Sequence, residues 1–369
     1  MAVVWRLDKC RYTCAYSAVL FGYRWVIKYL VEYFRGNAKL LAEDGYFTDF
    51  ISNGVSTELC FVAFCAFTLI IIFAGVQNGI ERVSKIMMPI LIVLSVIIAV
   101  YSVTRPGALA GVKYFLVPNV KNFSWMTVVS AMGQMFYSLS IAMGILITFG
   151  SYMKKDTAIE DSTRNVEIFD TGIAIMAGLM IIPAVFAFSG GDPDTLQAGP
   201  SLMFITIPKV FQNMGFGTVI GIVFFLLVLF AAVTSSIALT ESAVSTFEDE
   251  LGWGRKKATV LVGVIMLALG SLSSLGYGPL AGIKIIGMQF LDLFDFLTNS
   301  VMMPIAALLT SLFVSRVVGI DKIEAEIIHG ESAFRRKKVF VVMIKYLCPV
   351  FAIIILLSSV ANALGWIKM

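Results

Sequence analysis

The chain has 369 residues, of which 59% are hydrophobic and 14% are charged. Soluble globular proteins contain about 45–50% apolar and about 25% charged residues, so this composition indicates an integral membrane protein. The only histidine, His329, lies in a polar loop, and the five cysteines lack the spacing of a metal site. We therefore expect neither an enzyme nor a cofactor, and the net charge of +4 does not by itself indicate a partner.

Hydropathy predicts about nine membrane-spanning segments. They cover approximately residues 12–34, 58–76, 84–104, 126–152, 167–189, 216–247, 257–275, 287–314 and 339–362. Alternate connections are rich in Lys and Arg, as at 154–155, 255–257 and 335–338, and the others hold fewer. The positive-inside rule therefore predicts a cytoplasmic N-terminus and, with an odd number of spans, an external C-terminus.

Two of the external connections are long enough to have structure of their own. They run from Thr104 to Phe123 and from Gly190 to Met214. The second is apolar enough to fold back onto the helices, so we expect it to act as a lid or plug.

The span within residues 131–153 is interrupted by polar and helix-weakening residues. Gln134, Ser138, Ser140 and Gly144 fall through its middle, although no charge occurs before Lys154. Lipid cannot satisfy freed backbone groups, so irregular backbone at this depth is tolerated where it lines a cavity. Transporters often build their substrate and ion sites from such broken helices. The pattern predicts an unwound helix near residues 138–142.

A second polar patch lies in the span that starts near residue 216. Ala231, Thr234 and Ser235 share one helix face, because residues three and four apart are neighbours. One carbonyl and two hydroxyls at this spacing suit a monovalent cation. The alternative is that the hydroxyls bond back to the preceding turn or allow close helix packing.

Several acids lie in or beside the spans. Asp170 near the start of its span indicates an ion or proton site, or else an interfacial carboxylate that reaches headgroup water. Asp292 and Asp295 open a span at its external end, where acids also favour the helix dipole. The cytoplasmic run 247–257 (FEDELGWGRKK) mixes acids and bases as a solvated helix cap does.

Taken in order, these segments resemble the neurotransmitter:sodium symporter family. The similar stretches are GIERVSKIMMP (79–89), GQMFYSLSIAMG (133–144), GPSLMFITIPKVF (199–211), TSSIAL with FEDEL (234–239 and 247–251) and LDLFDFLT (291–298). The resemblance covers most of the chain from about Ala15 onward. It implies an all-α integral membrane fold, a sodium symporter bundle with inverted repeats, in which helix breaks form the binding site.

The resemblance also implies residue roles. The implied sodium ligands are Ser138, Asp170, Ala231, Thr234 and Ser235, and the implied substrate contacts are Tyr16, Tyr137, Ser140, Met143, Ser236 and Leu239. Asp295 matches the family's external gate, and Asp249 with Tyr152 matches its cytoplasmic gate.

Two positions depart from the family pattern near the predicted site. Ala142 replaces a glycine in the unwound segment, where a side chain disfavours positive φ. Asp170 stands where the family usually has an amide. We hypothesise that its charge substitutes for the chloride that animal members bind.

By the same resemblance, the chain starts at the family's third helix and ends after its eleventh. We expect one membrane domain with a truncated first repeat (1–125, helices three to five). A second repeat (126–315, helices six to ten) follows, and then a cytoplasmic loop with the last helix (316–369). Part of the substrate and sodium shells would then be missing.

The expected function is sodium-coupled import of an amino acid or related small amine by alternating access, with transport impaired in the chain as it stands. The alternative is a non-transporting fragment or one half of a split transporter. A membrane enzyme or proton channel that uses Asp170 has the least support. Expected partners are the substrate, sodium and the lipid of the plasma membrane, with no nucleic acid.

Overall fold

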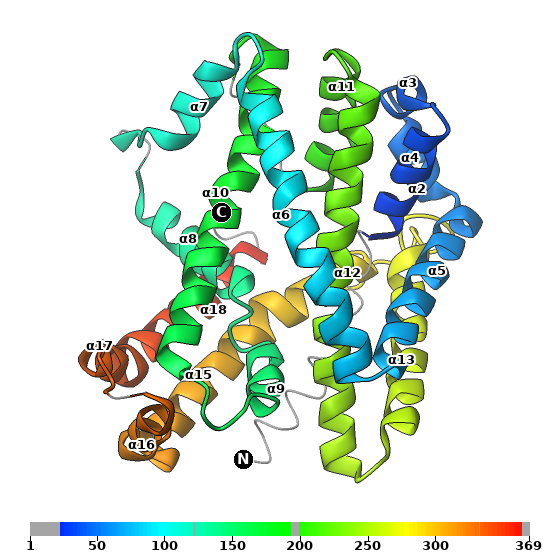
Figure 1. Cartoon of the computed structure of the whole chain (residues 1–369). Coiled ribbons are helices and arrows are strands. Elements are labelled where there is room, and N and C mark those ends of the chain that lie inside the picture. The colour runs from blue at the N-terminus through cyan, green and yellow to red at the C-terminus, as the bar shows by residue number, and fades with distance from the viewer. Residues whose placement is uncertain (1–22, 121–122, 193–198, 332, 364–369) are drawn as a thin grey trace.

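The computed structural model describes residues 23–120, 123–192, 199–331 and 333–363. These residues form helices and no strands, and a single isolated bridge joins Ile285 and Met288 (Figure 1). The α-helices are α2 (Tyr23–Phe34), α3 (Ala38–Leu41), α4 (Tyr46–Ser52), α5 (Gly54–Phe73), α6 (Arg82–Val103), α7 (Ala108–Leu116), α8 (Trp125–Ser138), α9 (Ile145–Ser151), α10 (Ile159–Ser189), α11 (Ile207–Gln212), α12 (Gly217–Leu251), α13 (Arg255–Leu275), α14 (Phe290–Asp295), α15 (Met303–Phe313), α16 (Ile320–Gly330), α17 (Lys337–Val342) and α18 (Cys348–Ala363). Short π-helical segments are η1 (Val76–Glu81), η4 (Leu202–Thr206), η5 (Phe296–Met302), η6 (Val314–Val318) and η7 (Met343–Leu347).

Seven helical stretches in the described part of the chain are long and apolar enough to cross a membrane. They are Gly54–Phe73, Val76–Val103, Ile159–Ser189, Gly217–Leu251, Arg255–Leu275, Phe290–Val318 and Lys337–Ala363. Two further spans were expected from hydropathy. The first, 12–34, lies partly outside the described residues, and α2 is its described portion. The second, 126–152, is divided into α8 and α9.

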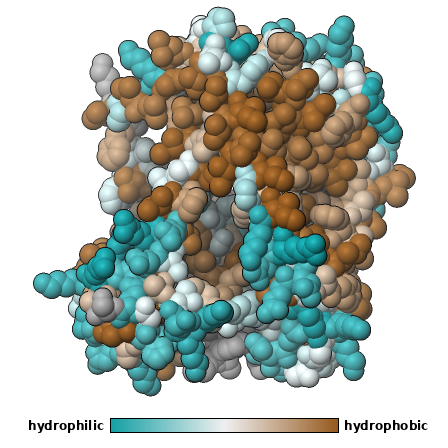
Figure 2. Space-filling model, viewed as in Figure 1, coloured by the Kyte–Doolittle hydropathy of each residue, from teal (hydrophilic) through white to brown (hydrophobic). Residues whose placement is uncertain are grey.

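The outer surfaces of these helices are apolar, as lipid requires. Leu59, Ile70 and Val264 expose 67%, 66% and 59% of their surface. Figure 2 shows a broad hydrophobic area that ends in hydrophilic atoms at both ends of the helices. Side chains of this kind on a soluble protein would form an aggregation-prone patch. A bilayer is therefore the environment that this surface fits.

The connection from residue 199 to 212 folds back onto the helices. Phe204 stacks on Phe47 with the rings 5.4 Å apart, and it also meets Trp25 of α2 edge-on. Its carbonyl accepts a 2.7 Å hydrogen bond from the Tyr29 hydroxyl, which is buried in the same cluster. Lys209 pairs with Asp44 at the rim. The segment therefore closes over one end of the α2–α12 pair.

Helices α5 and α13 approach closely because a glycine lies at their contact. The buried ring of Phe61 occupies the space beside Gly270, and a Cβ there would lie 2.1 Å from the ring. Small residues allow helix backbones to come together in membranes, where packing rather than hydrophobicity holds helices.

We expect Gly270→Ala to destabilise the fold by about 1–3 kcal/mol, because the new methyl group must displace Phe61. The matched control is Gly172→Ala on α10, where a Cβ meets nothing within 4 Å. Thermal unfolding of both variants in detergent measures the difference. Equal midpoints for wild type and Gly270→Ala would show that the α5–α13 contact is looser than described.

Candidate functional site

The helix that begins at Trp125 stops at Ser138 and resumes at Ile145. Between them the backbone turns through positive φ at Ser140 (53°), Ala142 (59°) and Gly144 (75°). Only Gly144 adopts such a φ without steric cost, since L-residues with a Cβ crowd the following carbonyl there. The unwound segment expected from the sequence is therefore present, and it includes the Ala142 position.

The break leaves backbone oxygens without the bonds that a helix would provide. Ile141 donates to the Phe136 carbonyl (2.9 Å) and Met143 to the Ser140 carbonyl (3.2 Å). No backbone N–H of the described residues bonds the carbonyls of Ser138, Leu139 or Ile141. These oxygens lie at the negative end of the α8 dipole, where a cation is favoured.

A cavity of about 360 Å³ lies between this break and the helices α12 and α6. Its lining residues are Met88, Tyr137, Ser138, Ser140, Met143, Ile145, Thr234, Ser235, Ala238 and Leu239. Seven of the ten were named from the sequence as substrate or sodium contacts. The structure therefore brings residues about 100 positions apart to one cavity.

The α12 wall of this cavity carries two hydroxyls. The Thr234 hydroxyl donates to the carbonyls of Phe230 (3.1 Å) and Ala231 (3.0 Å). Its proton is therefore bonded to the preceding turn of the helix, as the alternative interpretation expected. Its oxygen remains an acceptor, because a hydroxyl has two lone pairs besides its proton. Ser235 is exposed at the cavity wall. Neutral oxygens of this kind suit a hard monovalent cation.

Asp170 brings a negative charge to the break from α10. The Ser138 hydroxyl donates to its Oδ1 at 2.6 Å. Both interpretations of Asp170, an ion site and an interfacial carboxylate, stay predictions. The carboxylate is thus bonded to a residue that itself lines the cavity.

Other predicted residues lie elsewhere. Ser236 does not line this cavity, since it is fully buried with its hydroxyl 3.2 Å from that of Thr68 on α5. Tyr16 lies outside the described residues. Asp295 accepts a 2.7 Å hydrogen bond from Asn299 and does not line the cavity.

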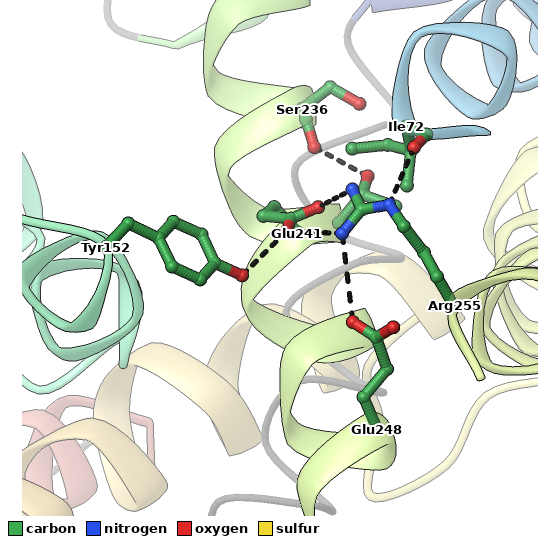
Figure 3. Close-up of polar contacts among 7 residues, drawn as sticks. Ile72, Tyr152, Ser236, Glu241, Glu248 and Arg255 are labelled. Atoms are coloured by element: carbon green, nitrogen blue, oxygen red, sulfur yellow. Dashed lines mark hydrogen bonds and ion pairs between the residues drawn. The ribbon is translucent and has the colours of Figure 1, made fainter. Parts of the chain in front are cut away.

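Further along α12 from the cavity, a buried ion pair joins α12 to α13 (Figure 3). Arg255 forms a bidentate contact with Glu241 (2.9 and 2.5 Å), and the Glu241 side chain is completely buried. The guanidinium also donates to the Ile72 carbonyl at 3.1 Å, and Glu248 lies 3.7 Å away. The Tyr152 hydroxyl donates to Glu241 at 2.7 Å.

This cluster differs from the cytoplasmic gate expected from the sequence. Tyr152 pairs with Glu241, whereas Asp249 is exposed on the last turns of α12. Glu241 was not predicted from the sequence, and Arg255 was expected only as a cation of a loop. The available signal was an acid within an apolar span, which by default indicates a functional site.

Met88, Ile145 and Ala238 line the cavity but were not predicted from the sequence. Ala238 lies one helical turn after Thr234.

The helices and the broken segment define a multi-pass membrane transporter fold, and comparison with known proteins agrees. A model of the sodium:neurotransmitter symporter family matches residues 12–366, and the chain belongs to this family. It is a family of transporters, not of enzymes, and it implies sodium as the coupling ion.

Individual relatives are similar over most of the chain. An uncharacterized sodium-dependent transporter of Bacillus subtilis, YhdH, is 33% identical across 95% of this chain and 77% of its own length. One from Haemophilus influenzae is 30% identical across 94% and 76%. The crystal structure of MhsT in complex with L-phenylalanine superposes with a TM-score of 0.84 at 32% identity, covering 97% of this chain and 81% of that one.

We expect Glu241→Gln to destabilise the protein by about 3–5 kcal/mol, because it leaves the Arg255 charge half-buried without its partner. Glu248→Gln is the control on the same helix, since Glu248 is more exposed and only 3.7 Å from Arg255. Thermal unfolding midpoints of the purified variants test this. A loss as large in Glu248→Gln as in Glu241→Gln would contradict the bidentate pair as the main contact.

Proposed function

We propose that the chain is a sodium-coupled symporter of an amino acid or a related small amine. The observation that carries this proposal is that the unwound segment 138–144 and the hydroxyls of Thr234 and Ser235 face one cavity. The cavity combines hydroxyl side chains and one nearby carboxylate with apolar walls from Met143 and Leu239, and free carbonyls of the break lie beside it. A ligand site of this kind is mostly apolar with a few placed polar groups.

In this proposal the sodium ligands are oxygens at the two sides of the cavity. Ser138 with Asp170 would hold one ion, and the Ala231 carbonyl with Thr234 and Ser235 would hold another. Both sets offer the oxygen ligands that a hard cation takes, and the α8 dipole adds a negative end. Carbonyls of an unwound helix coordinate sodium in transporters of this architecture.

The substrate would occupy the space between them. Ser140, Met143 and Leu239 line it, together with the ring of Tyr137. The amino acid is proposed because MhsT, solved with L-phenylalanine, shares the fold and a third of the sequence. Sodium would stabilise the outward-open site, and rocking of one bundle would open the other side.

Gating would then involve groups at the two ends of the cavity. Asp295 would act at one end, and the Tyr152–Glu241–Arg255 cluster would act at the other. Asp249 stays a prediction as a gate residue. The N-terminus would be cytoplasmic in a plasma membrane, following the distribution of Lys and Arg.

Removing one hydroxyl should weaken sodium binding. We expect Thr234→Ala and Ser235→Ala each to raise the sodium concentration for half-maximal amino acid binding several-fold, because each removes a ligand oxygen. Thr246→Ala is the matched control, since Thr246 on the same helix bonds the Ser242 carbonyl (2.8 Å) away from the cavity. Sodium titrations of radiolabelled amino acid binding in proteoliposomes measure the shift. Unchanged titrations in both site variants would contradict the proposed sodium ligands.

Uptake is measured in the same vesicles. Binding without uptake would favour the alternative of a non-transporting form. If no amino acid shows sodium-dependent binding or uptake, the proposed substrate class is wrong.

A second test concerns the charge of Asp170. We expect wild-type binding to be independent of chloride, and Asp170→Asn to lose sodium affinity that chloride partly restores, because an anion would replace the lost charge. Asp292→Asn serves as control, since Asp292 lies at the start of α14 and does not line the cavity. Sodium titrations with chloride or gluconate report the difference. Chloride-dependent uptake by wild type would end this hypothesis.

A further inference from the structure

A further intramembrane carboxylate, that of Glu58, lies away from the cavity, one turn into α5. The Ser271 hydroxyl of α13 donates to Oε1 of Glu58. Its Oε2 is shielded from solvent and has no hydrogen-bond partner among the described residues. An ionisable group in a membrane span is costly, and it usually has a partner or a function. Glu58 therefore has half of its hydrogen-bonding capacity unused.

This carboxylate borders a groove of about 500 Å³ between α5 and α13. The remaining walls are mainly apolar side chains of Val55, Leu59, Val62, Leu275 and Pro279. Val55, Leu59 and Val62 are 73%, 67% and 44% exposed, so the groove opens toward lipid and not toward the protein interior. The acyl chain of a lipid fits such apolar walls. The Glu58 carboxylate would then select the headgroup of that lipid.

The first turn of α5 supplies groups of the opposite polarity. Asn53 caps the helix by accepting from the Ser56 amide at 3.1 Å, and the Thr57 amide bonds the Asn53 carbonyl. The amides of Gly54 and Val55 donate to none of the described residues. Free amides at the start of a long helix favour an anion such as a phosphate.

We propose that this groove binds a phospholipid with a primary ammonium headgroup, an ethanolamine phospholipid of the leaflet at the Gly54 end of α5. The ammonium supplies the donor that Glu58 lacks, and the phosphate meets the amides of Gly54 and Val55. The terminal torsion of a glutamate is soft, so the carboxylate can turn toward the groove. A choline headgroup has no N–H to donate, and a glycerol headgroup has no positive charge.

The bound lipid would join α5 to α13, the pair that also packs through Phe61 and Gly270. Glu58 does not line the cavity between α8 and α12, so lipid binding can be tested apart from sodium and amino acid binding.

Native mass spectrometry of the full chain, delipidated and mixed with defined lipids, tests the proposal. Wild type should bind phosphatidylethanolamine at least about tenfold more tightly than phosphatidylcholine or phosphatidylglycerol, the scale of one charge-assisted hydrogen bond. Glu58→Gln should lose this preference. Leu59→Trp, which fills the groove and keeps the carboxylate, should lose the bound lipid altogether. Glu81→Gln is the control, because Glu81 is an exposed acid paired with Lys85.

Three results would overturn the proposal. One is an ethanolamine preference that survives in Glu58→Gln or Leu59→Trp. Another is a loss of the ethanolamine preference in Glu81→Gln as large as in Glu58→Gln, which would show a general charge effect. The third is a two-copy species that Leu59→Trp dissociates, which would show that a second chain and not a lipid covers the groove. If Glu58→Gln proves unstable, Leu59→Trp still decides the outcome.

Discussion

The central constraint on this structure is that backbone polar groups inside a membrane must have partners. Between Ser138 and Ile145 the helix stops, and several carbonyl oxygens have no backbone partner among the described residues. Lipid cannot satisfy them, so such a break persists only beside a polar cavity. The hydroxyls of α12 and the carboxylate of Asp170 are polar groups close to this break. The break and the cavity therefore depend on each other and are not separate features.

The break and its cavity could be predicted because they require unusual residues at membrane depth. Ser138, Ser140 and Gly144 interrupt an otherwise apolar span, and the spacing of Thr234 and Ser235 places both on one helix face. Helical spans follow from hydropathy in the same way. The segment 199–212 could be predicted only as an apolar connection, because the packing of Phe204 on Phe47 and Trp25 depends on tertiary structure.

Other parts of the site could not be predicted from local pattern. Ser236 is adjacent to Ser235, yet a rotation of 100° per residue turns it toward Thr68 on α5. The Glu241–Arg255 pair joins residues 14 apart on two consecutive helices, so neither residue alone indicates the contact. Tyr152 was placed in the gate, but its partner is fixed by how α9 lies against α12. Such pairings depend on packing between helices.

Two carboxylates within the membrane helices, Glu241 and Glu58, show opposite solutions to the same cost. The Glu241 carboxylate accepts two hydrogen bonds from the Arg255 guanidinium and one from the Tyr152 phenol, so its charge is compensated within the protein. One oxygen of the Glu58 carboxylate accepts a hydrogen bond from the Ser271 hydroxyl, and the other oxygen has no partner among the described residues. Breaking the first pair leaves an uncompensated charge, whereas the second already lacks a counter-charge at its groove. A compensated acid can be purely structural. For the one that borders an open apolar groove, the cation that we propose comes from outside the chain, and the membrane is the source in contact with it.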